Sequence, residues 1–343
     1  MHRDLPVPPH FDPEKVGKVW RVPFQKRASE AEDWARKQNI EPFHRDKFKI
    51  CLMAVDIQNT FCIPDFELFV GGRSGHAAVD DNVRLCRFIY RNLDVITQIC
   101  PTMDTHQAMQ IFHTLFWVNE KGEHPDPLTI ISKEDVEKGR WKFNSNLAPA
   151  LGVSEDYAQR YVRHYVKELH ESGKYDLTVW PYHVILGSIS HALVAAVEEA
   201  AFFHGIARFS KPNFQVKGSN PFTEHYSVLG PEVREDPDQK KIARKNEGFT
   251  QKLMDFDAVI IAGQAKSHCV AWTIDDLLED ITVRDKRLAE KVYLLEDCTS
   301  PVVVPGVVDY TEKGDQAFQR FQDAGMHLVR STDPIHSWPD IKL

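Results

Sequence analysis

Short apolar runs alternate with helix-forming segments along most of this chain, and this alternation restricts the possible folds more than any other feature. Six segments are predicted strands, and KICLMAVDI and FDAVIIAGQA among them have the apolar character of strands that are buried on both faces of a sheet. The predicted strands are residues 49–57 (KICLMAVDI), 95–104 (VITQICPTMD), 208–218, 256–265 (FDAVIIAGQA), 291–297 and 327–332.

The segments between these runs carry apolar residues at helical spacing. The predicted helices are 77–92, 191–205, 269–281 and 317–325, and we expect the second to end at Gly205. Strands that alternate with helices through short connections form a mostly parallel sheet with helices on both faces. The sequence therefore predicts an α/β fold with three αβα layers, similar to a Rossmann fold.

The 343 residues suffice for one large domain with attached segments. Residues 1–48 are rich in Pro, Lys, Arg and Glu, and we interpret them as an N-terminal extension that wraps the domain or mediates oligomer contacts, with a short helix at 30–38. The domain then covers 49–343. Two polar segments, 121–177 and 233–248, interrupt the alternation. We interpret both as solvated surface insertions, and the alternative is that either folds over the site as a lid.

Charge and composition exclude several function classes. The net charge of −8, from 42 basic and 50 acidic residues without a basic stripe, argues against a nucleic-acid partner. The chain has no run of about 18 apolar residues and no apolar signal segment, so we expect no membrane association and a cytoplasmic location. The six cysteines show no CxxC spacing, which excludes a disulfide framework or a zinc knuckle.

Candidate catalytic residues follow the predicted strands, because sites in parallel α/β folds lie at the carboxyl ends of strands. Asp56 follows the first strand in AVDIQNTF and is placed for proton transfer, although a turn or helix-capping role is the alternative. Cys269 follows a strand and the loop QAKSH and opens a predicted helix. A helix N-terminus lowers the pKa of a thiol and offers free N–H groups to an oxyanion. The alternative for Cys269 is a buried structural cysteine.

A lysine near these two residues would stabilise an ionised network. Lys217 lies just past a predicted strand in FQVKGSNPFTEHYS and is one candidate, with an ordinary surface lysine as the alternative. Lys211 and Lys266 compete with it on the same grounds.

Aspartate and histidine side chains also gather after strands. Asp104 and His106 form a D-x-H pair, and His183 ends the motif WPYH. Two residues at i and i+2 of an extended segment lie on one face, and a third imidazole would complete three metal ligands with positions left for water or substrate. His113 and His124 are reserve ligands. The alternative is that these histidines make only local hydrogen bonds.

Six motifs in order carry a resemblance to a known family. They are AVDIQNTF, MDTH, WPYH, VKGSNPFTEHYS, IIAGQAKSHCVAWT and LLEDCTS, spread over roughly residues 48–333. In this set the chain resembles the isochorismatase-like cysteine hydrolases, and most closely their nicotinamidase branch. The resemblance implies a catalytic triad of Asp56, Lys217 and Cys269. The family's lysine precedes a glycine and lies upstream of a Tyr-Ser pair, which selects Lys217 over Lys211.

The resemblance also implies features around the nucleophile. A cis, non-proline peptide bond is expected at Gln264–Ala265, with the backbone N–H groups of Ala265 and Cys269 as oxyanion donors. In the nicotinamidase branch a divalent metal binds an Asp and two His residues, which fall here on Asp104, His106 and His183. Zinc is the expected ion, with manganese or iron as alternatives.

The activity implied by this resemblance is hydrolysis of a small amide, in the manner of nicotinamide cleavage to nicotinate and ammonia. The alternatives are another small amide, a carbamoyl or ureido compound, or a non-catalytic binding or scaffold protein with the same fold. We expect a small-molecule amide as substrate and a homo-oligomer as the assembly.

Overall fold

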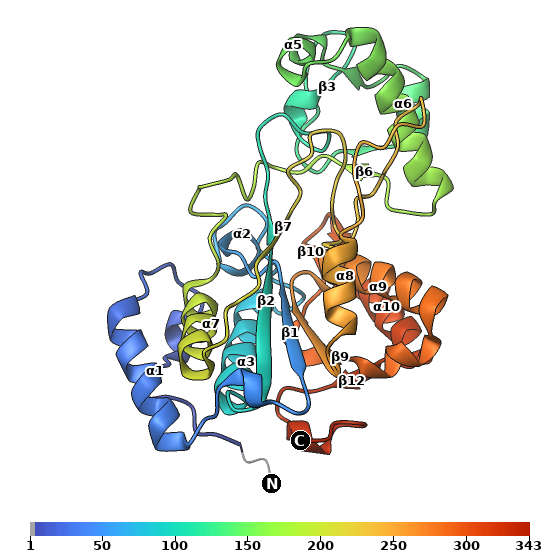
Figure 1. The fold of residues 1–343 in the computed structure, drawn as a ribbon. Coiled ribbons are helices and arrows are strands. Elements are labelled where there is room, and N and C mark those ends of the chain that lie inside the picture. Colours follow the sequence, from blue (N-terminus) through green and yellow to red (C-terminus); the bar gives the residue numbers. More distant parts are fainter. Residues whose placement is uncertain (1–3) are drawn as a thin grey trace.

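The predicted strands form one parallel sheet at the centre of the molecule (Figure 1). The computed structural model describes residues 4–343, and within them the sheet has six strands in the order β12-β9-β8-β1-β2-β7. Every neighbouring pair in this sheet is parallel. The strands are β1 (Ile50–Val55), β2 (Ile96–Asp104), β7 (Gln215–Lys217), β8 (Ala258–Gly263), β9 (Val292–Leu295) and β12 (His327–Val329).

The side of β1 on which the chain adds successive strands changes once, and this topological switch point lies between β1 and β8. From β1 the chain runs outward to β2 and β7, then returns to β8 on the other side of β1 and runs outward to β9 and β12. In open parallel sheets the ligand crevice forms outside the carboxyl ends of the strands at such a switch point. Asp56 directly follows β1, and Cys269 follows β8 after a short loop, so both lie at this point of the sheet.

Side chains of β1 alternate between the two faces of the sheet, as the two-residue period of a strand requires. Cys51, Met53 and Val55 pack in one hydrophobic cluster. This cluster also contains side chains of α8 (Glu247–Met254), α9 (Ala271–Arg284) and α10 (Thr311–Asp323). The intervening residues of β1 pack in a second cluster, with α3 (Ala77–Arg91) and α7 (Ala195–Arg208). The predicted fold class, three αβα layers around a parallel sheet, is confirmed.

The predicted end of one helix at Gly205 is wrong. Helix α7 runs through Gly205 to Arg208 and ends where Phe209 adopts a left-handed conformation. A Cβ atom at position 205 would lie 3.2 Å from the backbone oxygen of Ser210. The glycine therefore allows the chain that leaves the helix to fold back closely against it.

The N-terminal extension packs on the domain. Its helix α1 (Phe24–Gln38) begins before the predicted segment 30–38 and lies beside α7 (Figure 1). Arg27 of α1 forms a buried ion pair with Glu199 of α7, and Ala31 is fully buried. Residues 1–3 of the predicted extension lie outside the described residues.

The insertion at 121–177 is not the solvated segment that its composition predicts. It forms most of a lobe above the carboxyl ends of the strands (Figure 1). One face of helix α6 is buried in a core that also contains Trp117 and Phe143. Polar residues dominate the sequence because the other face is solvated, and the apolar face becomes visible only at helical spacing. The lobe comprises α4 (Lys133–Glu137), α5 (Ala148–Leu151), α6 (Glu155–Glu171), β3 (Trp117–Val118), β4 (Ile130–Ile131), β5 (Lys142–Phe143) and β6 (Leu177–Thr178).

The charge run at 233–248 is largely solvated, as predicted, and Arg160 of α6 pairs with Asp238 at 3.1 Å. The remaining elements are α2 (Asn59–Cys62), β10 (Val303–Val304) and β11 (Val308–Asp309). Among residues 4–343, no helix combines the length and the apolar character that crossing a bilayer requires.

Candidate functional site

The three residues of the predicted triad meet at the switch point of the sheet. The Nζ atom of Lys217 lies 2.9 Å from Oδ2 of Asp56 and 3.7 Å from Sγ of Cys269. All three side chains are buried. Residues that are 161 and 213 positions apart from Asp56 in the sequence thus form one contact network at the ends of β1, β7 and β8.

Asp56 is held in an unusual backbone conformation by its neighbour on β2. Its φ angle of 45° lies in the left-handed region, which aspartate tolerates better than most residues. The Asp56 amide donates to Oγ1 of Thr102 at 3.0 Å, and the same hydroxyl donates a short hydrogen bond to Oδ1 of Asp56. These bonds leave Oδ2 to face Lys217. Thr102 lies two residues before Asp104 on the same face of β2, which is a sequence signal that the motif analysis missed.

Lys217 carries the positive charge that balances this buried site. Its Nζ also lies 3.1 Å from Oδ1 of Asp104 and donates to the backbone oxygen of His225 at 2.7 Å. Burial by itself would lower the pKa of the ammonium, but the Asp104 and Asp56 carboxylates hold that pKa well above its ordinary value. Lys217 is therefore a fixed cation. The competing candidates are elsewhere: Lys211 is exposed, and Lys266 pairs with Asp315 at 2.6 Å.

Cys269 lies one turn before the regular helix that it was predicted to open. Residues Lys266–Val270 form a π-helical turn, and α9 begins at Ala271. Burial raises the pKa of the Cys269 thiol well above its ordinary value, and the Lys217 charge offsets this only in part. Burial therefore acts against the lowering of this pKa that a helix N-terminus was expected to give, because loss of solvation disfavours the thiolate.

The loop that precedes Cys269 contains the cis peptide bond Gln264–Ala265. The Gln264 side chain donates to Oδ2 of Asp81 at 2.8 Å, and the Gln264 amide donates to the backbone oxygen of Val55 at 2.9 Å. The loop is thereby tied to α3 and to β1. The role of the Ala265 and Cys269 amides as oxyanion donors stays a prediction.

The predicted metal ligands gather beside the triad. Nε2 of His106 lies 3.1 Å from Oδ1 of Asp104, and Nε2 of His183 lies 3.9 Å from Oδ2 of the same carboxylate. A donor atom from each of His106, His113 and His183 lies within 4.8 Å of the others. Of the two reserve ligands, His113 joins this cluster. His124 does not, because it is exposed and bonds to the backbone oxygen of Trp117.

The protonation of these histidines suits a metal ion. Nδ1 of His113 contacts the backbone oxygen of Ala108 at 3.2 Å, and Nδ1 of His183 contacts that of Pro181 at 2.8 Å. A carbonyl can only accept, so each Nδ1 carries the hydrogen and each Nε2 keeps a lone pair. Burial also lowers the pKa of His113 to about 3 and that of His183 well below its ordinary value. Both imidazoles are neutral, as metal ligation requires.

Two further features fit a metal at this position. Within the described residues, Nε2 of His113 and Nδ1 of His106 are buried without a hydrogen-bond partner. Gly218 has a φ angle of 87°, and a Cβ atom there would lie 2.5 Å from Oδ1 of Asp104. Three imidazoles and a carboxylate are a donor set that zinc, manganese and iron all accept. The residues present therefore fit a divalent metal.

Gln58 orients the aspartate of this cluster. Its side chain donates to the backbone oxygen of Asp104 and accepts from the Asp104 amide, both at 2.8 Å. The side chain thus replaces a strand neighbour at the end of β2. On the other side, Val184 has a φ angle of 41°, which is rare for a β-branched residue. Such strain persists where the surroundings impose it, and it lies next to His183.

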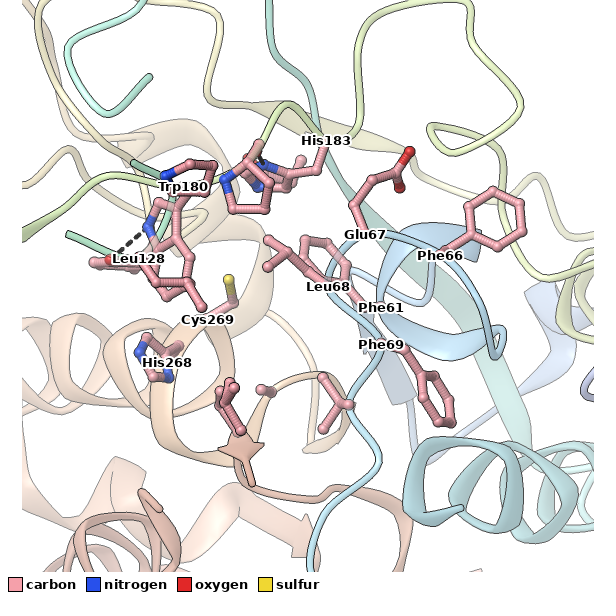
Figure 2. Close-up of a pocket in the computed structure, with 18 of the residues that line it drawn as sticks. Phe61, Phe66, Glu67, Leu68, Phe69, Leu128, Trp180, His183, His268 and Cys269 are labelled. Carbon is pink, nitrogen blue, oxygen red and sulfur yellow. Dashed lines mark hydrogen bonds and ion pairs between the residues drawn. The ribbon is translucent and has the colours of Figure 1, made fainter. Parts of the chain in front are cut away.

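A cavity of about 340 Å³ opens onto Cys269 (Figure 2). The Cys269 sulfur points into the space between Trp180 on one side and Leu68 on the other (Figure 2). Asp104, His106 and His183 also line it, so the triad cysteine and the metal candidates share one chamber.

Glu224 is a wall residue that the sequence analysis missed. It is buried, and Nε1 of Trp180 donates to its Oε1 at 2.8 Å. Burial raises the pKa of Glu224 well above its ordinary value, and the nearby Glu232 adds to this. A glutamate in TEHYS just after the predicted triad lysine is a weak signal, because its burial depends on Trp180 from a distant segment.

Comparison with known proteins gives matches among solved structures only. No family model matches the chain, and no curated protein matches it. The nicotinamidase–pyrazinamidase of Acinetobacter baumanii is 18% identical, with a TM-score of 0.49 over 84% of this chain and 99% of that chain. The yeast nicotinamidase Pnc1p is 17% identical, with a TM-score of 0.48 over 82% and 99%. The pyrazinamidase of Pyrococcus horikoshii, in complex with zinc, is 16% identical, with a TM-score of 0.42 over 82% and 98%.

These three structures are nicotinamidases or pyrazinamidases, the branch that the sequence motifs resemble. At such identities and TM-scores, the fold assignment rests on the strand order of the sheet. The chemistry rests on the geometry of the site.

Proposed function

We propose that the protein is a cysteine hydrolase of the isochorismatase-like family, closest to the nicotinamidase branch, and that it cleaves a small amide to a carboxylic acid and ammonia. The observation that carries the proposal is the contact of Lys217 with both Asp56 and Cys269, at 2.9 and 3.7 Å, beside a cavity. Nucleophile, base and an orienting third group within contact distance are the signature of covalent catalysis.

The first half-reaction forms a thioester. Asp56 takes the proton of the Cys269 thiol as the sulfur attacks the amide carbonyl, and the carbonyl oxygen becomes an oxyanion. Burial raises the pKa of Asp56, although Lys217 opposes this, and a raised pKa makes the carboxylate a better base. The C–N bond then breaks, and Asp56 returns its proton to the departing nitrogen, which leaves as ammonia.

The second half-reaction restores the enzyme. Asp56 takes a proton from a water molecule while the water oxygen attacks the thioester carbon. The C–S bond then breaks, and Asp56 returns the proton to the sulfur of Cys269. Lys217 remains charged throughout and stabilises the anionic member of the pair at each step. The backbone amides of Ala265 and Cys269 are the proposed donors to the oxyanion.

Asp104, His106 and His183, joined by His113, are the proposed ligands of a divalent metal. When bound, such an ion supplies Lewis-acid polarisation of an oxygen or nitrogen ligand. These residues line the same cavity as Cys269, except His113, which clusters with His106 and His183 but is not among the lining residues. A substrate atom or a water in the cavity can therefore reach these proposed metal ligands.

A metal analysis tests these ligands. Elemental analysis of the purified protein is expected to find about one divalent ion per chain, since three imidazoles and a carboxylate complete a site. His183→Ala is expected to lose most of that metal, and His106→Ala likewise, because first-ligand loss weakens binding strongly. His124→Ala, an exposed histidine outside the cluster, should keep it. A metal-free protein that is fully active and insensitive to chelators contradicts the assignment.

An ammonia-release assay tests the proposed reaction. Wild-type protein is expected to release ammonia from nicotinamide or from another neutral primary amide over many turnovers. The scaffold alternative expects binding without ammonia at any protein concentration. The buried ion network argues against a scaffold, because holding two carboxylates, an ammonium and a thiol away from water costs stability and adds nothing to a binding surface.

A further inference from the structure

We propose that the substrate is an uncharged primary amide whose acyl group is apolar and larger than a single six-membered ring. This inference rests on the proposed amide hydrolysis and concerns the part of the substrate that does not react. It follows from the size, the wall and the charge of the cavity that opens onto Cys269 (Figure 2).

The cavity is too large for one ring. Its volume is about 340 Å³, whereas an apolar cavity of about 150 Å³ already accommodates benzene. Ligand pockets bury most of the surface of their ligands, so a one-ring amide would leave about half of this space without contacts. A substrate with a second ring, or with a chain of similar volume, fills it.

The wall away from the catalytic residues is apolar and comes from three separate segments. Residues 61–70 supply Phe61, Phe66, Leu68 and Phe69. These residues lie on the side of the cavity opposite Trp180 (Figure 2). The lobe supplies Leu128, and the segment around β10 supplies residues 302–305. Aromatic and aliphatic walls of this kind recognise a ligand by burial of apolar surface.

The lobe's contribution to this wall is held in place before any ligand arrives. Leu128 has a φ angle of 70°, a left-handed conformation that is uncommon for a bulky residue. Its amide donates to the backbone oxygen of Val179 at 2.6 Å, which ties it to the strand segment leading to Trp180. Strained residues of this kind occur at ligand clamps, where a preformed wall lowers the entropy lost on binding.

Apart from the proposed metal site, the lining has no cationic partner for an anionic substrate. Among the described residues that line the cavity there is no arginine and no lysine, and the nearby Lys217 is already committed to Asp56 and Asp104. A carboxylate on the part of the acyl group that faces the apolar wall, away from the proposed metal ligands, would be buried without a cationic partner, which costs binding energy. Acidic members of the amide and carbamoyl alternatives are therefore disfavoured.

Inside the cavity the lining offers no unpaired buried anion for a cationic substrate either. Asp104 is paired with Lys217, and Glu224 accepts a hydrogen bond from Trp180 while burial raises the pKa of its carboxyl. Glu67 is exposed at the rim, where it accepts from Thr60 at 3.1 Å. The other titratable lining groups are His106, His183, His225, Tyr226, His268 and Cys269. A neutral apolar acyl group is the remaining match.

Three amides that differ in one respect each test this substrate class. Benzamide has one ring, 2-naphthamide has two, and 6-carboxy-2-naphthamide adds a carboxylate to the two rings. For ammonia release by wild type, kcat/KM is expected to be about tenfold higher for 2-naphthamide than for benzamide, from the added apolar contact. The carboxylate is expected to lower it again by about tenfold or more. A preference for benzamide or for the acidic amide overturns the inference.

Binding separates this inference from the proposed reaction. Dissociation constants of the same three amides are measured by calorimetry on the Cys269→Ala protein, which cannot turn them over. Tightest binding of 2-naphthamide supports the ligand class even if wild type releases no ammonia, and that combination overturns the proposed reaction alone. Equal or reversed affinities overturn the ligand class.

A change in the wall provides a second, independent readout. Leu68→Trp fills part of the cavity and is expected to reduce the 2-naphthamide to benzamide ratio of kcat/KM by about tenfold. Leu68→Met keeps the volume and serves as the matched control, with the ratio retained. Because the readout is a ratio, a general loss of folded protein cancels. An unchanged ratio in Leu68→Trp contradicts a ligand that fills this side of the cavity.

Discussion

Replacing Cys269 by alanine is expected to lower the rate of ammonia release by at least about 10⁴-fold, because removal of a nucleophile from a catalytic unit leaves only the residual contribution of binding and oxyanion stabilisation. The comparison is kcat on the same amide for wild type and for a Cys269→Ala sample free of wild-type contamination. Loss of one sulfur atom from a small buried side chain leaves the fold intact, so circular dichroism spectra should coincide.

Cys298→Ala is the matched control for this prediction. Cys298 is also buried and follows β9, but its sulfur lies near Asp297 and away from Lys217. Its replacement removes the same atom from a similar environment and should retain activity. Hydrolysis that persists in a pure Cys269→Ala sample would sink the thioester mechanism, whatever the substrate.

Replacing Lys217 by methionine is expected to lower the free energy of unfolding by about 3–5 kcal/mol, the usual cost of removing one partner from a buried ion network. Methionine keeps the length of the side chain but not its charge. The carboxylates of Asp56 and Asp104, which lie 2.9 and 3.1 Å from Nζ, then remain buried without their cation. Urea unfolding at neutral pH measures the change.

Two further variants make the Lys217 measurement specific. Lys266→Met removes a lysine whose partner, Asp315, is largely exposed, and it should cost less than about 1 kcal/mol. Adding Asp56→Asn to Lys217→Met removes one of the stranded charges and should recover part of the loss, as a double-mutant cycle would report. If Lys217→Met and Lys266→Met lose equal stability, the buried network is not what stabilises this end of the sheet.

Local sequence patterns predicted the sheet well, because a strand that is buried on both faces of a sheet has an apolar sequence of its own. The runs that became β1 and β8 are continuously apolar, and a strand covered on both sides needs no other signal. Patterns predicted the lobe poorly. The buried face of α6 is spread over a polar segment at helical spacing, and the elements that cover it, α4 and β5 among them, come from other parts of the chain.

The site shows the same division. Asp56, Lys217 and Cys269 could be proposed from the sequence because the ends of parallel strands meet at one edge of a sheet. His113 could be named only as a reserve ligand, since its approach to His106 and His183 depends on the path of the loop after β2. Leu128 carried no pattern and Glu224 only a weak one, because a cavity wall is assembled from segments that touch only in the folded chain.

The sequence by itself determined that Cys269 follows a strand near Asp56 and Lys217, since the order of the strands along the chain and the positions of their ends are encoded locally. Only the tertiary structure decided the direction of its pKa shift and its surroundings. A thiol's pKa depends on how completely the packed chain removes water, and here burial outweighs the nearby Lys217 charge. The size and charge of the cavity are likewise set by contacts between distant segments, and the proposed substrate class rests on them.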